Sequence, residues 1–420
     1  MKSTLTGFAA AVSLCTAQFV AAQTGGLKDP SKDAAAPAEK APAAPAEDGP
    51  ILKSRQSTVF GLLVMQIGEG KLAGQASQMN CTAVKGGTDP AVLKFNQDVG
   101  PEMEGALNEV KKYMSVKHNG WLNGWVIEMS FEDRYQPKDG PSAAVACALM
   151  LDSLITGDPL QEKVAVTGDL TAAGTVQPVG GVPDKLRAAA AKQCTVACIP
   201  IKNARSMADH ALLKGPRVLT AIQIFTTEKF EDARKVAGTP RDPEVVKAIS
   251  EFAEIARVIN ANANPAAAVR HPKVVERLRK VLASASNHLS AKLLLDMATG
   301  TGTKALSAAG SLEAINSESE ALVSGIRSGA PEKLSKDKIA DALSRLTAIR
   351  PRLDKRTTAY ADALVDFGKA FRQYSSDGGP DTASEAQKAV LDLRSKASRV
   401  STEWDKLRTD QALMETVMDQ

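Results

Sequence analysis

Two residues of this 420-residue chain, Ser142 and Lys185, could together perform nucleophilic chemistry. A serine hydroxyl is a weak nucleophile until a base takes its proton, and a lysine amine can be that base if it is neutral. A free lysine has a pKa of about 10.4, so the pKa must fall by roughly three units, which corresponds to about 4 kcal/mol. Burial among apolar side chains lowers it, since desolvation disfavours the ammonium. The segments near Lys185 supply such side chains: Val164, Val166, Val179, Val182 and Leu186.

Three sequence blocks surround these residues. Ser142 lies in Pro-Lys-Asp-Gly-Pro-Ser-Ala-Ala (137–144), Thr-Gly-Asp follows at 167–169, and Lys185 ends Pro-Val-Gly-Gly-Val-Pro-Asp-Lys (178–185). In this order and at this spacing the blocks resemble the proteolytic domain of Lon proteases, which uses a Ser–Lys dyad. The resemblance covers roughly residues 58 to 237. It implies that Ser142 is the nucleophile, that Lys185 is the general base and that Thr167 holds the lysine amine.

The loop before Ser142 is expected to support catalysis. Asp139 matches an acidic position of the family motif and is predicted to order the loop rather than to act as a second base. Ser142 begins a predicted helix, whose first amides carry partial positive charge. The Gly140 and Ser142 amides are therefore candidates for an oxyanion hole. The chain departs from the family pattern at Ala144, where glycine is usual, and at Asp169, which replaces glutamate.

Other kinds of chemistry find less support in the sequence. The four histidines lie in no recognisable catalytic motif, and the cysteines lack the paired spacing of a zinc site. These 420 residues contain no phosphate-binding Gly-x-x-x-x-Gly-Lys-Ser/Thr loop, so the ATPase module of Lon proteases has no predicted counterpart. We expect no cofactor and no metal. Aromatic residues make up 4% of the chain and the net charge is +4, which argues against a nucleic-acid partner.

The N-terminus is predicted to be a targeting segment. Lys2 precedes a mostly apolar stretch from Phe8 to Val20, and small residues follow, so residues 1–22 are interpreted as a signal peptide. Lipidation at Cys15 is disfavoured because Leu14 precedes it. Residues 23–56 form an Ala/Pro-rich linker with too little apolar surface to fold. The sequence thus predicts a protein exported to the periplasm or the extracellular space, with no stable membrane insertion after signal removal.

The remaining chain divides into two predicted parts. Residues 57–238 show an α+β pattern, which the resemblance identifies as a Lon-type proteolytic domain. Residues 241–420 are predicted to be an all-α domain that ends in a long antiparallel hairpin at about 336–419, with Pro351 kinking or breaking its first helix. Export permits disulfides, but the sequence does not decide whether Cys81, Cys147, Cys194 and Cys198 form them.

The leading functional hypothesis is an exported, ATP-independent serine endopeptidase that cleaves unfolded or exposed protein segments. Two alternatives stay open at this point. The protein could cleave its own linker once and then act structurally, or the protease fold could be an inactive scaffold whose helical domain binds a protein partner. The sequence leaves the oligomeric state, including a homo-oligomer, undecided.

Overall fold

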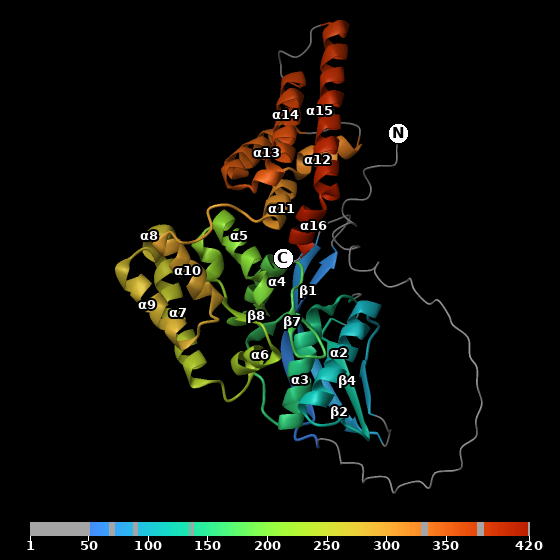
Figure 1. The fold of residues 1–420 in the computed structure, drawn as a ribbon, viewed down its shortest axis with the longest axis vertical. Helices are drawn as coiled ribbons and strands as arrows, with labels where there is room; N and C mark the ends of the chain where they lie inside the picture. The colour runs from blue at the N-terminus through green and yellow to red at the C-terminus, as the bar shows by residue number, and fades with distance from the viewer. Residues whose placement is uncertain are drawn as a thin grey trace, which may run out of the picture.

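The computed structural model describes residues 51–66, 72–86, 91–133, 135, 138–328, 335–375 and 382–418. The predicted signal peptide and residues 23–50 of the predicted linker lie outside these residues. Within them, the predicted fold class is confirmed: a domain with a mixed β-sheet is followed by a helical region (Figure 1).

The strands are β1 (Gln56–Gln66), β2 (Leu72–Lys85), β3 (Val92–Phe95), β4 (Trp125–Phe131), β5 (Val164–Val166), β6 (Asp169–Leu170), β7 (Val176–Gln177), β8 (Val196–Pro200) and β9 (Gln223–Thr227). The helices of the sheet domain are α2 (Pro101–Lys117), α3 (Ala144–Thr156), α4 (Val182–Ala191), α5 (Ala204–Lys214) and α6 (Phe230–Ala237). The later helices are α7 (Pro243–Ala261), α8 (Pro265–Val269), α9 (Pro272–Ser284), α10 (Leu289–Thr299), α11 (Ala308–Glu318), α12 (Glu320–Ser328), α13 (Lys336–Ile349), α14 (Thr358–Tyr374), α15 (Ala383–Thr409) and α16 (Gln411–Met418).

In the part of the chain that the structure describes, seven strands form the main sheet in the order β3-β4-β2-β1-β5-β8-β9. The pairs β1–β2 and β2–β4 are antiparallel, whereas β3–β4, β1–β5, β5–β8 and β8–β9 are parallel. Strand β5, Val-Ala-Val, lies in the interior of this sheet and is fully buried, as expected for a central parallel strand. Strands β6 and β7 form a separate two-stranded ribbon.

Helices α3 and α4 lie on opposite faces of the sheet. A Cβ added to Gly61 of β1 would lie 2.4 Å from Met79 Sδ and 4.0 Å from Ala146 of α3, whereas one added to Gly74 of β2 would lie 2.1 Å from the backbone of Asp184 in α4. Successive residues of a strand point to opposite faces of the sheet. Gly74 pairs with Val64, which is three positions from Gly61, so the two glycines face opposite sides. The absence of a side chain at Gly74 therefore lets α4 approach its face closely, whereas Gly61 leaves room for the Met79 side chain beside α3. α3 is buried along almost its whole length because α2 and α6 cover its outer side.

The first hydrophobic core does not end at the predicted boundary near residues 238–241. It extends from Leu52 to Leu294 and includes buried residues of α7 to α10. The join is made at edge strand β9, where His288 lies between the rings of Phe225 and Phe252, each 4.5 Å away. These helices thereby cover the edge that β9 would otherwise leave open.

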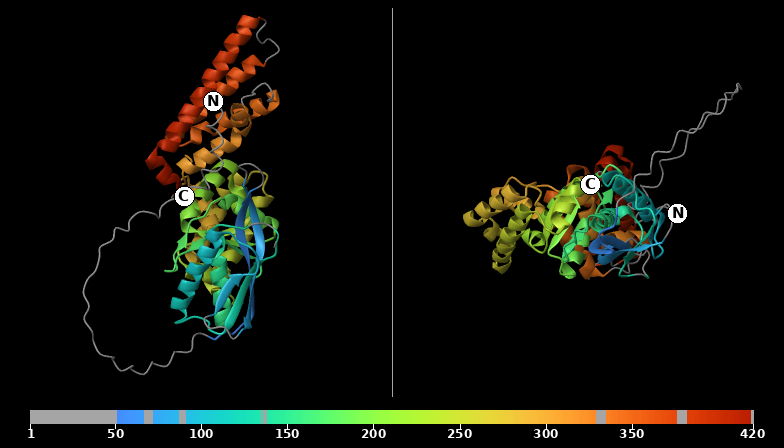
Figure 2. Two further views of the ribbon diagram at one scale, coloured as in Figure 1. Left: turned by 90° about the vertical axis from the view of Figure 1, so that its right-hand side faces the viewer. Right: turned by 90° about the horizontal axis from the view of Figure 1, so that it is seen from below.

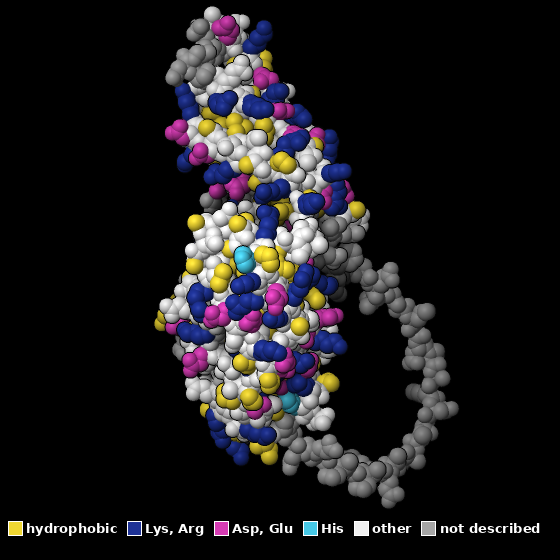
Figure 3. Space-filling model, turned by 90° about the vertical axis from the view of Figure 1, so that its left-hand side faces the viewer, with side chains coloured by type: hydrophobic (Ala, Val, Ile, Leu, Met, Phe, Trp, Pro, Cys, Tyr) yellow, Lys and Arg dark blue, Asp and Glu magenta, His cyan; other side chains and the backbone are white. Residues whose placement is uncertain are grey.

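A second core, from Leu306 to Leu413, belongs to α11–α16. Figures 1 and 2 show this region extending from the sheet domain as an arm beside α5. Leu212 and Leu213 of α5 pack against the second core, and Asp209 accepts a hydrogen bond from the Ser307 amide at 3.1 Å. On the face drawn in Figure 3, basic and acidic side chains are interspersed over both parts of the molecule.

The terminal hairpin is formed by α14 and α15. Tyr360 lies 5.4 Å from Trp404, and Asp366 is paired with Arg399 at 2.7 Å, so the two helices run antiparallel. The buried residues Leu393, Val400 and Leu407 recur every seven positions, which is typical of a helical seam. Residues 376–381, which join these two helices, lie outside the described residues.

Both predicted arms of this hairpin are interrupted. The first divides into α13 and α14. A 3₁₀ turn at Arg350–Arg352 contains Pro351, which lacks an amide donor, and a second 3₁₀ turn at Lys355–Thr357 directly precedes α14. The second ends at Thr409, and the Asp410 side chain accepts from the Leu413 amide at the start of α16. Among the described residues, no helix is long and apolar enough to cross a membrane.

Candidate active site

Ser142 and Lys185 meet in space although 43 positions separate them. Lys185 Nζ lies 2.8 Å from Ser142 Oγ. Lys185 projects from the first turn of α4, and Ser142 lies in a 3₁₀ turn, Pro141–Ala143, that precedes α3. The serine thus lies just before the α-helix that the sequence predicted to begin at this residue. The residues directly after β5 contact both: Thr167 Oγ1 lies 3.2 Å from Lys185 Nζ, and the Gly168 amide donates to the Ser142 carbonyl at 3.0 Å. The two side chains therefore meet beside the carboxyl end of β5.

Lys185 is fully buried, with no exposed surface. Burial lowers the pKa of Lys185 to about 7. The predicted apolar surroundings are present: Val164, Val166, Val182 and Leu186 are buried, and Val179 packs against the same core. Desolvation therefore brings the amine to the protonation range that a general base needs near neutral pH.

Thr167 determines how the amine is oriented. Its hydroxyl donates to the carbonyl of Leu62 at 3.1 Å, and the carbonyl of Ser142 lies 3.3 Å away. A hydroxyl has one proton, so Thr167 Oγ1 accepts from Lys185 Nζ, 3.2 Å away. A neutral amine that donates to Thr167 keeps its lone pair for the proton of Ser142. Thr167 is buried directly after β5, so the strand end fixes its position.

Asp139 stabilises the start of α2, a role that the spacing along the chain did not reveal. Its Oδ1 accepts from the amides of Glu102 and Met103 at 3.1 and 3.2 Å. These are among the unpaired donors that begin a helix, and the preceding Gly100 has no side chain to bond them. Asp139 thereby ties the loop before Ser142 to α2, in keeping with the predicted ordering role.

Gly140 does not fit its predicted part in an oxyanion hole. Its amide donates to Asp139 Oδ1 at 2.7 Å and is therefore engaged. Its φ of +88° explains why glycine stands here, because a side chain disfavours that region. The amide of Ser142 stays a prediction. Ala144, which replaces the usual glycine, is the buried first residue of α3.

The cysteines and histidines take other positions. Cys81, Cys147, Cys194 and Cys198 are free and buried. Within the described residues, no group of three or more histidine, cysteine, aspartate and glutamate side chains could hold a metal ion. Buried His288 has a pKa lowered to about 3 by desolvation, and its Nδ1 accepts the Ala291 amide at the start of α10. It serves the fold, as a neutral imidazole.

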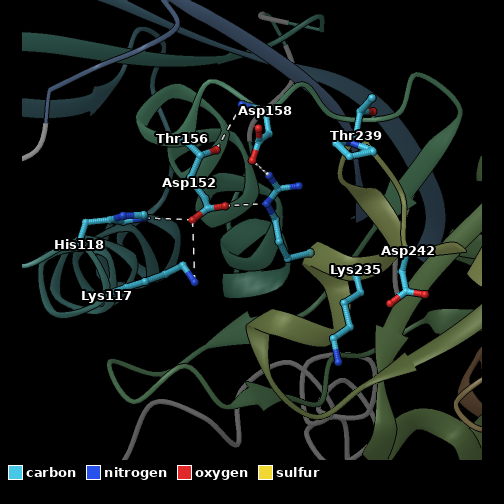
Figure 4. A pocket seen from close by; sticks show the side chains of 10 residues that line it. Lys117, His118, Asp152, Thr156, Asp158, Lys235, Thr239 and Asp242 are labelled. Atoms are coloured by element: carbon cyan, nitrogen blue, oxygen red, sulfur yellow. Dashed lines mark hydrogen bonds and ion pairs between the residues drawn. The ribbon is translucent and has the colours of Figure 1, made fainter.

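A second polar cluster lies toward the C-terminal end of α3, where Asp152 is ten residues, or about 15 Å at 1.5 Å per residue, from Ser142 (Figure 4). Asp152 is 2% exposed and accepts from His118 Nε2 at 3.0 Å and Arg234 Nε at 2.7 Å. Burial opposes ionisation of Asp152, but these hydrogen bonds and the charges of Lys117 and Arg234 outweigh it and lower its pKa. The cluster joins the ends of α2, α3 and α6.

Replacing Asp152 with asparagine should therefore destabilise the protein by about 2 to 4 kcal/mol, because Arg234 would lose a buried counter-charge. The stabilisation is present above the unfolded pKa of about 3.9 and is lost as the pH falls through the lower folded value. Urea unfolding at pH 7 measures the effect. Asp158→Asn is the control: it touches the same arginine but is 51% exposed and should cost about 0.5 kcal/mol or less. Equal costs would contradict the prediction.

Comparison with known proteins matches this part of the chain to one family. Residues 112–237 match the model of the Lon protease (S16) C-terminal proteolytic domain. The chain is 27% identical to a Lon protease of Geobacter metallireducens over 199 residues, which cover 47% of this chain and 23% of the relative. It is 47% identical to one of Azorhizobium caulinodans over 96 residues (23% and 11%), and 34% identical to that of Escherichia coli over 114 residues (27% and 14%). The chain thus spans less than a quarter of the length of these relatives.

Proposed function

We propose, from the premise that residues 112–237 belong to the Lon protease proteolytic domain family, that this protein is an exported serine peptidase that works without ATP. The observation that carries the proposal is the 2.8 Å contact between Ser142 Oγ and a fully buried Lys185 amine. Family membership supports a Lon-type serine peptidase. The contact supports a Ser–Lys dyad as the catalytic apparatus.

In the proposed reaction, neutral Lys185 takes the proton of Ser142 as the serine oxygen attacks the scissile carbonyl. The resulting ammonium gives that proton to the leaving amine, and an acyl-enzyme forms on Ser142. Water then attacks the ester, with Lys185 again accepting a proton and returning it to Ser142. Thr167 holds the amine in line throughout, and Asp139 holds the loop that carries the serine.

Independence from ATP is supported by the sequence, since these 420 residues contain no phosphate-binding loop of the Walker type. Without an unfolding motor, the substrates should be chains that are already extended: unfolded proteins, exposed loops or peptides. Export is supported by Lys2 and the apolar stretch from Phe8 to Val20.

The purified protein should digest unfolded casein in the absence of nucleotide, and added ATP with Mg²⁺ should change the rate less than about twofold, since a site poised by burial gains nothing from them. Gel electrophoresis and release of acid-soluble peptides measure this. Stable casein would contradict the peptidase proposal. Stable casein with a clipped wild-type N-terminus would favour self-processing, and neither event would favour the inactive scaffold. Hydrolysis that requires ATP would contradict only the ATP-independent part.

A further inference from the structure

A short segment connects strand β7 to helix α4 and leads directly to Lys185. Residues 178–181, Pro-Val-Gly-Gly, form this connection. The Val179 amide donates to Asn203 Oδ1 at 3.1 Å, and Asn203 Nδ2 donates to the Val179 carbonyl at 2.9 Å. The asparagine side chain thus pairs with both polar groups of one residue, as a neighbouring β-strand would.

Asn203 is not used in the way that its place in the chain suggests. It ends the 3₁₀ turn Ile201–Asn203 and directly precedes α5, in the N-cap position from which an asparagine side chain often accepts an amide of the first turn. Here its backbone is helical, with φ −81° and ψ 0°, and its side chain makes no capping bond. The side chain is 1% exposed. The buried side-chain amide of Asn203 therefore bonds the connection before α4 and does not cap α5.

The start of α4 is also held from the side of the sheet. Gly181 has φ +67°, and a Cβ there would lie 2.6 Å from Val64 of β1. At Gly74 of β2 a Cβ would lie 2.5 Å from the Lys185 amide nitrogen. The Lys185 amide in turn donates to the Gly181 carbonyl at 3.0 Å. The first turn of α4 is therefore pressed against two strands, and Asn203 holds the segment that enters it.

We propose that Asn203 is a positioning residue for the Ser142–Lys185 pair, which it serves by fixing Val179 and with it the start of α4. This role rests on the proposed peptidase function. Asn203 takes no part in bond making. It keeps the lysine amine in its dry site and within bonding reach of the serine. A displacement of about 1 Å at a reacting group can cost about 10²-fold in rate.

Asn203→Leu keeps the branched shape and the number of side-chain heavy atoms, and removes both hydrogen bonds to Val179. The expected result is a fall in kcat of about 10²-fold with KM changed less than about threefold, since reacting groups rather than substrate contacts are displaced. The rising limb of the kcat–pH profile should also move to higher pH, because a looser site admits water to Lys185. Asn203→Asp keeps the acceptor for the Val179 amide but faces the Val179 carbonyl with a carboxylate, and should lower kcat about tenfold.

Asn287→Leu is the matched control. Asn287 Nδ2 likewise donates to a backbone carbonyl, that of Thr226 at 3.0 Å, but at the junction of β9 and α10. This variant should lower stability to a similar degree and leave kcat and the pH limb unchanged. Wild-type kcat and an unmoved limb in both Asn203 variants would overturn the proposal. So would equal losses of kcat in Asn203→Leu and Asn287→Leu, since the effect would then be general.

A measurement that does not need turnover separates this inference from the peptidase function. Nitrogen-15 NMR of labelled lysine side chains, with the Lys185 signal assigned from Lys185→Arg, follows the titration of its amine. In Asn203→Leu the pKa should move from its lowered value toward the ordinary value of about 10.4. That movement would support the positioning role even if wild-type protein cleaved nothing, an outcome that would defeat the proposed function alone. An unmoved titration would overturn the role even in an active peptidase.

Discussion

Replacing Ser142 with alanine is expected to lower casein hydrolysis by about 10³-fold or more, because the acyl-enzyme can no longer form. The folded structure should remain, since the methyl group of alanine fits where the Cβ of serine already lies. Lys185 keeps its bond to Thr167. Initial rates over protein concentrations that rule out a trace contaminant measure the loss, and thermal unfolding reports on the fold.

Ser115→Ala is the control for this change. Ser115 is half-buried, and its hydroxyl donates to the Lys111 carbonyl within α2, so it resembles Ser142 in exposure but not in setting. Its loss should leave the rate within about twofold. If Ser142→Ala retained more than about a tenth of wild-type activity, the nucleophile would be a different residue.

Replacing Lys185 with methionine should have two opposite effects: the loss of activity and a gain in stability. The activity should fall by about 10³-fold, because methionine cannot take a proton from Ser142. In wild-type protein the neutral amine forms above its pKa, so kcat/KM should rise with pH through about 7 and then level off. No rise of this kind should remain in the variant.

The stability gain follows from the same burial. A lysine whose pKa falls to about 7 on folding destabilises the protein below that pH, since the unfolded chain keeps its proton up to about 10.4. This cost is fully present below the folded pKa and disappears as the pH rises through the unfolded value. Methionine removes it but loses the bonds to Ser142 and Thr167. The net gain should be about 2 to 4 kcal/mol at pH 6 and should shrink toward pH 10.

Urea unfolding at pH 6 and pH 10 measures this gain, with Lys292→Met as the control. Lys292 is exposed and pairs with Asp296 one turn away, so its loss should change stability by about 0.5 kcal/mol or less at either pH. A Lys185→Met protein that is less stable than wild type at pH 6 would mean that the lysine is charged and satisfied in the folded state. That result would also count against its role as a base.

Local patterns were enough to predict several elements. The alternation of apolar residues at 125–131 predicts a strand, which is β4, and the apolar run after Ser142 predicts a helix, which is α3. Patterns were less informative where a tertiary contact sets an end of an element. The sequence pattern also predicts a strand at 218–225, but the structure has a 3₁₀ turn at Pro216–Leu219 and begins strand β9 only at Gln223, where pairing with β8 sets its position. The break in the first arm of the hairpin could be predicted because Pro351 stands there.

The sequence by itself determined which reactive groups the protein contains: a serine, a lysine and a threonine in three ordered blocks, with apolar residues near the lysine. Only the tertiary structure decided the geometry. It brought the Lys185 amine 2.8 Å from the Ser142 hydroxyl and turned Asn203 away from its own helix toward Val179. Asp139 likewise bonds amides more than 35 positions away. The physical reason is that such contacts depend on how strands pair and helices pack. The local sequence around a side chain that could cap the nearest helix does not indicate that it will bond a distant backbone group instead.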